Sequence, residues 1–382
     1  MNPRRITRPA AVVVFFALAL VPVIFFGKTD PWADGAPRAT AAPKPFPQVL
    51  AANTFRRIAE WFNDRKGLRF PLLRLGLDWS MTVWQPRVRG SVILGRGSWL
   101  FWSDDETGHT AAMADIRGRL RLDDSAVKTI DTQLGMVRAR YAACGRQAFV
   151  VVAPNKQSIY PEELGVGFSG FAPSRLDGLL EKLSPSARPM MIDLRPALRA
   201  AKSDHPVPLY YRTDTHWNAF GIFHSYRRIV ETLARAGAID RPELAALANY
   251  DLTISPYAGG DMAQRVLNAP WRFPDSDVVL TPKSPLATAV RTIGSDRISF
   301  ANPAGKGRLL MIGDSFAPLL APFLARHFAE VTVLERVYWP LAFDGAMTAA
   351  LRADVTLLET IERALPDLAT APRNLDRACA EG

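Results

Sequence analysis

A serine that could act as a nucleophile follows a short apolar segment near the C-terminus. Residues 308–312 are typical of a buried strand, and Gly313-Asp314-Ser315-Phe316 comes directly after them. Ser315 would then lie at the carboxyl end of a parallel strand, the edge where open α/β sheets bind ligands. The free N–H groups at the start of the next helix could stabilise an oxyanion formed when Ser315 attacks a carbonyl. A plain turn with Ser315 as a helix cap is the alternative that this motif leaves open.

Among the five histidines, His216 is the best candidate for the base that such a serine needs. It lies in Asp214-Thr215-His216-Trp217, directly before a predicted amphipathic helix at 219–236. Because Asp214 and His216 are two residues apart, an extended backbone would place both side chains on one face. The carboxylate could then fix the tautomer and orientation of the imidazole. The sequence thus predicts a Ser315–His216–Asp214 triad, with a structural Asp–His pair as the alternative, and leaves open whether His216 and Ser315 meet.

Two further segments could bind a substrate. Asn155 and Lys156 follow a predicted strand, so that Asn155 could donate to an oxyanion and Lys156 could hold an anionic group, although both could be ordinary loop residues. Arg96 lies in the segment GRGSWLFW, residues 95–102, whose aromatic rings could stack on sugars. Buried hairpin aromatics are the favoured interpretation of that segment. With Trp217 beside the histidine, these residues complete the predicted substrate-binding set.

No pattern in the sequence calls for a metal or a cofactor. The glycines at 165, 167 and 170 match G-x-G-x-x-G, but they do not directly follow a strand, so they indicate no dinucleotide site. No Walker A, zinc-protease or calcium-loop pattern is present either. Since the chemistry of a serine triad needs neither, we expect no metal and no cofactor.

The elements that must position these residues alternate between strands and helices. Short apolar strands are predicted at 148–153, 190–194, 308–312, 330–334 and 354–358, with helices at 124–143, 176–183 and 219–236 among them. This alternation predicts an α/β fold in which a parallel sheet is flanked by helices on both faces. Residues 257–285 break the pattern, and we expect an irregular insertion or a lid there.

The N-terminal segment predicts export. Arg4, Arg5 and Arg8 precede an apolar run without charges at 10–26, which favours a transmembrane anchor with residues 1–9 in the cytoplasm. No small-residue cleavage site closes the run, although a signal cleaved near 39–42 is the alternative. Residues 27–55 then read as a linker and 56–382 as the catalytic domain. We therefore expect an inner-membrane protein whose catalytic domain lies in the periplasm.

Composition and charge agree with a folded, exported protein. The 382 residues are 48% hydrophobic and 22% charged. The net charge of +10 favours an anionic polymer or a membrane surface over a cationic partner, with a general bias toward arginine as the equally open alternative. No clustered basic–aromatic patch or zinc-finger spacing occurs, so we expect no nucleic acid. Cys144 and Cys379 could form a disulfide in an oxidising compartment, but two cysteines alone do not prove the pairing.

Taken together, the segments around His216 and Ser315 resemble the alginate O-acetyltransferase family, of the AlgJ and AlgX type, with its SGNH-hydrolase-like domain. The resemblance rests on Asp214-Thr215-His216-Trp217 paired with Gly313-Asp314-Ser315-Phe316. Softer matches are residues 95–101, Pro154-Asn155-Lys156 with Tyr160-Pro161-Glu162, and residues 354–363. The resemblance covers about residues 90–365, and the segment 257–285 matches no block of the family.

This resemblance implies an O-acetyltransferase that works through an acetyl-serine. It implies that Ser315 is the nucleophile, His216 the base and Asp214 the residue that orients it. It also implies a membrane-bound acetyl donor protein of the MBOAT type in the inner membrane, and an exported polysaccharide such as alginate as acceptor. A periplasmic carbohydrate acetylesterase and a catalytically silent polysaccharide-binding subunit are the alternatives that the sequence leaves open.

Overall fold

The computed structural model describes most of the chain beyond residue 90. The described residues are 74–75, 78–79, 88–89, 91–103, 112–165, 172–240, 243–257, 259–283, 289–292, 297–335, 343–369 and 374–379. The chain divides into two compact units, residues 1–86 and 87–382, and all candidate site residues lie in the second. The predicted cytoplasmic tip, anchor and linker lie outside the described residues. Within the described ranges, no helix is long and apolar enough to cross a membrane.

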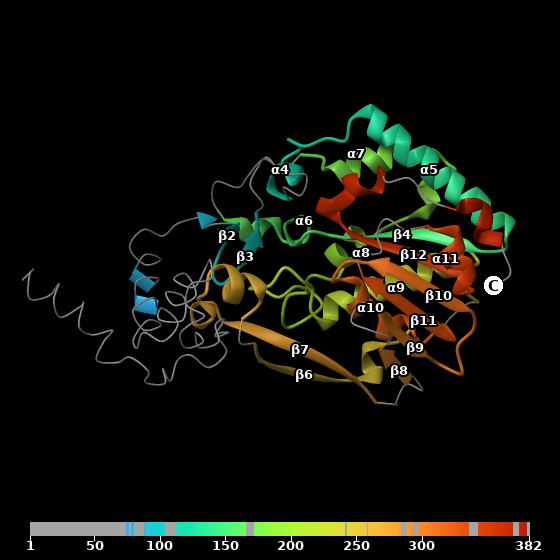
Figure 1. Cartoon of the computed structure of the whole chain (residues 1–382). Coiled ribbons are helices and arrows are strands. Elements are labelled where there is room, and N and C mark those ends of the chain that lie inside the picture. The colour runs from blue at the N-terminus through green and yellow to red at the C-terminus, as the bar shows by residue number, and fades with distance from the viewer. Residues whose placement is uncertain are drawn as a thin grey trace, which may run out of the picture. The chain divides into compact units, whose positions relative to one another are not determined.

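A seven-stranded sheet forms the centre of the second unit, in the order β5-β4-β12-β10-β11-β9-β8 (Figure 1). Its first five strands in this order are parallel, as predicted, whereas β9 and β8 extend one edge in antiparallel pairing. The strands are β4 Gln147–Ala153, β5 Met191–Asp193, β8 Ala289–Thr292, β9 Arg297–Ala301, β10 Arg308–Gly313, β11 Glu330–Glu335 and β12 Val355–Ile361. The α/β fold is therefore confirmed, with a mixed rather than purely parallel sheet.

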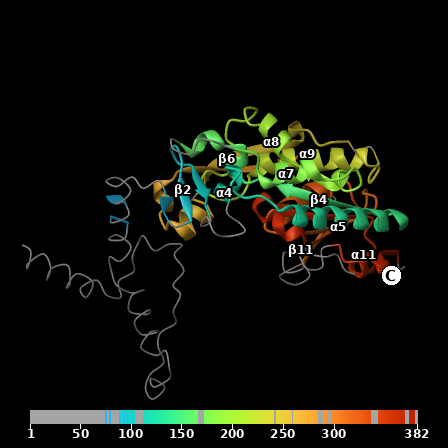
Figure 2. The ribbon, with the colours of Figure 1, turned by 90° about the horizontal axis from the view of Figure 1, so that it is seen from above.

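Helices cover both faces of this sheet. They are α4 Ala112–Ile116, α5 Asp124–Ala143, α6 Lys156–Ile159, α7 Arg175–Lys182, α8 Arg195–Ala200, α9 Ala219–Arg235, α10 Ala317–Leu324 and α11 Gly345–Ala350. Alternate residues of β4 show why two layers are needed, because Val151 packs into the core under α8, α9 and α10, whereas Val150 packs into the core under α5 and α7. Figure 2 shows α9 on one side of β4 and α5 on the other.

Two smaller antiparallel sheets accompany the central one. A three-stranded sheet contains β1 Val88–Arg89, β2 Val92–Leu94 and β3 Leu100–Trp102. The other is a long ribbon of β6 Tyr250–Tyr257 and β7 Asp275–Pro282. The segment predicted as an irregular insertion, residues 257–285, is irregular apart from short helical turns over residues 259–274, as predicted, but it continues into the regular strand β7. The strands β6 and β7 escaped prediction because few of their side chains are buried, which removes the apolar alternation of a buried strand.

A disulfide joins Cys144, which follows α5, to Cys379 near the C-terminus. The two residues are 235 positions apart, so the bridge restricts a long loop of the unfolded chain. We expect the double variant Cys144→Ser/Cys379→Ser to lose about 2–5 kcal/mol of unfolding free energy in urea titrations.

The bridge should not affect the chemistry, since Cys144 precedes the start of β4 whereas Ser315 follows the end of the parallel strand β10. Turnover of a soluble acetyl ester should therefore be retained in the double variant below its unfolding transition. A variant that lost turnover while keeping its stability would contradict this separation of the bridge from the site.

Candidate active site

Ser315 lies in the turn between β10 and α10, and its exposed side chain is accessible. Gly313 ends the strand where no side chain fits, because a Cβ there would lie 2.6 Å from a carboxylate oxygen of Glu359. Asp314 fixes the turn: its N–H donates to the same carboxylate over 3.1 Å, and its own carboxylate accepts from the N–H of Ile361 over 3.2 Å. The turn thus presents the serine hydroxyl at the carboxyl edge of the sheet.

A chain of hydrogen bonds joins Ser315 to His216 and Asp214. The Oγ of Ser315 lies 2.7 Å from Nε2 of His216, and Nδ1 of His216 lies 2.6 Å from Oδ1 of Asp214. With the proton on Nδ1, the ring donates to the carboxylate and accepts the serine O–H at Nε2. The structure therefore brings together three residues from distant parts of the sequence, in the arrangement that general-base activation of a serine needs.

The carboxylate of Asp214 is held in its ionised form. Burial alone would raise the pKa of this carboxyl, but hydrogen bonds from the His216 ring and from the backbone N–H of Asp261 outweigh burial and lower it below its usual range. The same oxygen that binds the ring also accepts the backbone N–H of His216 over 3.0 Å. The backbone bends at these residues and does not run extended, and the bend lets the carboxylate reach both the ring and the backbone N–H of a histidine two residues on.

Lys156 holds the loop of Asp214 from inside the protein. Its Nζ donates to the carbonyl oxygens of Tyr211, Arg212 and Asp214 at 3.0, 2.9 and 2.8 Å. Burial lowers the pKa of this ammonium to about 7, although the negative charges of the nearby aspartates act in the opposite direction and raise it. Since three carbonyls occupy its three N–H groups and only 3% of the residue is exposed, Lys156 serves the fold of the site, in contrast to the predicted contact with an anionic substrate.

We expect Lys156→Met to destabilise the protein by about 3 kcal/mol or more, because three buried carbonyls would lose their donor. Urea unfolding measures the loss, and turnover of an acetyl ester should fall with it as the loop loosens. The control is Lys182→Met, which removes a surface ion pair with Asp124 and should change stability by less than about 1 kcal/mol. Equal stability of the Lys156 variant and the wild type would show that the loop does not depend on this contact.

Three of the aromatic residues predicted to contact substrate, Trp217, Trp99 and Phe101, are buried, whereas Trp102 is partly exposed. Trp217 is 1% exposed, and its ring packs edge-on against Phe316 with centroids 5.0 Å apart. Its indole is thus part of the core, in contrast to the predicted contact with substrate. Trp99 and Phe101 are stacked inside the β2–β3 hairpin, and the Nζ of Lys156 lies over both rings at 5.7 and 5.3 Å from their centroids. Trp99 and Phe101 therefore belong to the core of the hairpin, in agreement with the favoured interpretation of this segment as buried hairpin aromatics.

The remaining two predicted substrate-binding residues differ in their surroundings. Arg96 is exposed in the turn between β2 and β3, where its backbone N–H donates to the carbonyl of Glu163 over 2.8 Å. Asn155 is 1% exposed after β4, and its Oδ1 accepts from Nη1 of Arg363 over 3.2 Å. Its Nδ2 is buried and has no acceptor among the described residues. The roles of both residues toward a substrate stay predictions.

The connection between β6 and β7 and the first residue of β7 contribute contacts that the sequence did not reveal. Asp275 accepts the backbone N–H and the hydroxyl of Thr213 at 2.9 and 2.7 Å. The N–H of Gly260 donates to the same hydroxyl over 2.9 Å, and the N–H of Asp261 donates to Oδ2 of Asp214 over 2.8 Å. The segment predicted as a lid therefore clamps the loop of the histidine. Two adjacent glycines before an aspartate, which permit close backbone approach, were the available signal.

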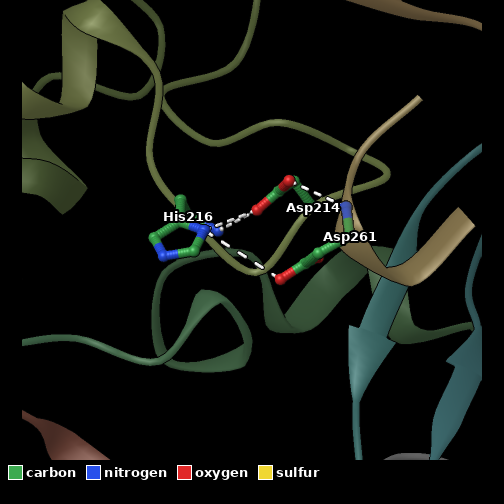
Figure 3. Close-up of side chains that lie close together, drawn as sticks. All are labelled: Asp214, His216 and Asp261. Atoms are coloured by element: carbon green, nitrogen blue, oxygen red, sulfur yellow. Dashed lines mark hydrogen bonds and ion pairs between the residues drawn. The ribbon is translucent and has the colours of Figure 1, made fainter. Parts of the chain in front are cut away.

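Asp214, His216 and Asp261 form a cluster of possible metal ligands, shown in Figure 3. One ligand atom of each lies within 4.8 Å of the others. Each of these groups is already hydrogen-bonded, because Nδ1 of His216 faces Asp214 and both carboxylates accept backbone N–H groups. An ion would have to displace these contacts and the proton on the ring, so the geometry favours acid–base chemistry over metal binding.

Comparison with known proteins identifies the domain that holds these residues. The family model of the SGNH hydrolase-like domain of the acetyltransferase AlgX matches residues 92–358. The chain is 28% identical over 200 residues to the probable alginate O-acetylase AlgJ of Pseudomonas putida, a match that covers 50% of this chain and 46% of that protein. The matched region thus spans about half the length of that relative.

Solved structures share the fold. PatB1 of Bacillus cereus matches with a TM-score of 0.55 and 16% identity, over 72% of this chain and 96% of that one. The same protein with a sulfonyl adduct also gives a TM-score of 0.55, over 74% of this chain and 97% of that one. Together with the family match over most of the chain, these findings identify the domain: the chain belongs to the alginate O-acetyltransferase family and has its SGNH hydrolase-like fold.

Proposed function

We propose that this chain moves an acetyl group, by way of an ester on Ser315, to hydroxyl groups of an exported polysaccharide. The observation that carries the proposal is the hydrogen-bonded chain from an exposed serine hydroxyl through His216 to an ionised Asp214. A serine with a base on its hydroxyl, and a carboxylate behind that base, is equipped for acyl transfer. The family to which the chain belongs supports the acetyl group as the one transferred.

In the first step Ser315 takes the acetyl group. Nε2 of His216 accepts the hydroxyl proton while Oγ bonds to the acetyl carbonyl carbon, giving a tetrahedral oxyanion and an imidazolium. The oxyanion then collapses, the bond to the donor oxygen breaks, and the imidazolium returns its proton to that leaving oxygen. Asp214 stabilises the imidazolium through the bond at Nδ1.

We assign two hydrogen-bond donors to the oxyanion, the backbone N–H of Ser315 and Nδ2 of Asn155. The backbone N–H of Ser315 makes no hydrogen bond within the described part of the chain, and the buried Nδ2 of Asn155 likewise has no acceptor there. Asn155 follows β4 and Ser315 follows β10, and the single strand β12 lies between them in the sheet. The N–H of Ser315, left unpaired in the resting protein, needs no rearrangement when negative charge develops, whereas the buried Nδ2 of Asn155 would have to turn toward the oxyanion.

In the second step a sugar hydroxyl takes the place of the donor. Nε2 of His216 removes its proton, the sugar oxygen attacks the acetyl-serine, and Oγ of Ser315 leaves and regains the proton. Alginate or a similar polymer is the proposed acceptor, which the name of the probable alginate O-acetylase relative supports. The high exposure of Ser315 favours a second candidate, an acetylesterase, because water can reach the same intermediate.

The deciding experiment supplies purified protein with a soluble acetyl ester, with and without oligosaccharides of alginate. A transferase should consume the ester faster when the oligosaccharide is present, and acetyl groups should appear on the sugar by mass spectrometry. Rapid hydrolysis that the sugar leaves unchanged would instead identify an esterase. A protein that binds the oligosaccharide but turns over no ester in either assay would be a silent binding subunit.

The place of this reaction is also a proposal. An uncleaved anchor at 10–26 in the inner membrane would hold the catalytic domain in the periplasm, beside a membrane-bound acetyl donor of the MBOAT type. The Cys144–Cys379 disulfide supports an oxidising compartment. Acetyl groups made in the cytoplasm must cross the membrane before they reach an exported polymer, which supports a donor embedded in that membrane.

A further inference from the structure

The turn at Gly260 and Asp261 approaches Asp214 more closely than any side chain would allow. A Cβ added to Gly260 would lie 2.2 Å from Cβ of Asp214 and 2.6 Å from its Cα. From this position the backbone N–H of Asp261 donates to Oδ2 of Asp214. Both oxygens of Asp214 are therefore engaged, one by the imidazole of His216 and the other by this turn.

The carboxylate of Asp261 points toward the same imidazole (Figure 3). Its Oδ2 lies 4.0 Å from Nδ1 of His216, and the side chain is 29% exposed. The two oxygens also accept the backbone N–H and the hydroxyl of Thr215, at 2.8 and 2.5 Å. These contacts keep the carboxylate of Asp261 beside the ring. At this distance, well below the Debye length, dissolved salt weakens the interaction between the carboxylate and a charged imidazole only slightly.

We propose that Asp261 is a second positioning carboxylate for His216, which stabilises the imidazolium formed when Ser315 gives up its proton. The inference rests on the proposed function, since it concerns the same histidine. Asp214 would act through a hydrogen bond, and Asp261 through its charge and its hold on Thr215. Because attraction between charges falls only with the inverse of distance, a carboxylate 4.0 Å away still favours the cation over the neutral ring.

A purely structural role makes a different prediction, and Asp261→Asn separates the two. Asparagine has the same size, keeps an oxygen that can accept the N–H of Thr215, and keeps the backbone N–H that binds Asp214. The charge is lost, and the oxygen that accepted the Thr215 hydroxyl becomes an amide N–H donor, from which that hydroxyl can accept after its own proton rotates away. If Asp261 merely held the turn, the asparagine variant would behave like the wild type.

We expect Asp261→Asn to lower kcat for a soluble acetyl ester about tenfold while KM stays within about twofold, because the charge acts on the transition state and not on substrate binding. Asp261→Glu restores the charge and should recover part of kcat. The control Asp251→Asn removes an exposed aspartate from β6 and should change neither constant. Melting temperatures of all variants should stay within a few degrees of the wild type.

The second readout needs no turnover. The low-field proton resonance of Nδ1 of His216 should shift in Asp261→Asn and stay in place in Asp251→Asn. An unchanged resonance together with a wild-type kcat in Asp261→Asn would overturn the role of Asp261. Wild-type protein that turns over no ester would instead count against the proposed function, and the resonance would still decide whether Asp261 acts on the ring.

Discussion

Ser315→Ala is expected to lower kcat for a soluble acetyl ester by about 10⁵- to 10⁶-fold, the loss typical of removing the nucleophile from a serine triad. Alanine cannot form the acetyl ester, so only the oxyanion donors and substrate binding would remain to assist direct attack by water. The stability should change little, because the hydroxyl is exposed and His216 is its only hydrogen-bond partner within the described residues. The variant should still bind an acetylated substrate.

The measurement is ester turnover at saturating substrate, together with urea unfolding of the same preparations. Ser255→Ala is the matched control, since Ser255 is an exposed serine on β6 and should keep full activity. A Ser315 variant that kept more than a few per cent of wild-type turnover while folded would mean that another group carries the acetyl.

His216→Gln is expected to cost about as much as the loss of Ser315, on the order of 10⁵-fold in kcat, because the serine is a weak nucleophile without its base. Glutamine can still hydrogen-bond to Ser315 but cannot take and return a proton. The double variant Ser315→Ala/His216→Gln should be no worse than either single variant, since the two residues act as a unit.

The control for this prediction is His205→Gln. His205 lies in the loop that leads to the site, and its Nε2 contacts that of His224 at 2.7 Å, so it tests the effect of losing a half-buried histidine near the same segment. We expect nearly unchanged turnover in that variant. Losses that multiply in the double variant Ser315→Ala/His216→Gln would contradict the joint action of Ser315 and His216.

Helices and strands with a strong apolar pattern were predictable from the sequence. The helix predicted at 124–143 has those bounds in α5, because Asp123 caps its start and Gly145, with a φ of 67°, follows its end. The buried strands were predicted to within a few residues for the same reason, since strands covered on both faces are apolar throughout. The ribbon of β6 and β7 was not predictable, because its exposed residues carry no such pattern.

The residues of the candidate triad could be proposed from the sequence, but their meeting could not. Ser315 and His216 are 99 residues apart, and only the order of the strands brings their loops to one edge of the sheet. For Lys156 and Trp217, by contrast, the sequence suggested a role that the structure does not support. A lysine and a tryptophan beside a site suggest contact with substrate, yet three carbonyls take the ammonium and Phe316 packs against the indole. Which side chains turn inward depends on tertiary contacts that local sequence does not encode.

The role of Asp261 could not be predicted, because this residue lies in a segment that matched no block of the family. The close approach of Gly260 to Asp214 brings the carboxylate of Asp261 to the histidine. A glycine in the sequence permits such an approach but does not indicate which residue will lie against it. Whether Cys144 and Cys379 pair was open for a similar reason, since the sequence does not show whether two distant cysteines meet in space.

The most direct test of the account is to look for the acetyl group on Ser315. Wild-type protein would be mixed with a soluble acetyl ester, quenched in acid within one turnover, digested and mapped by mass spectrometry. The account predicts an acetyl group on the peptide that contains Ser315, its disappearance when an oligosaccharide acceptor is added before the quench, and its absence in His216→Gln. Acetyl on a different residue, or turnover with no acetyl on this peptide at any time, would contradict it.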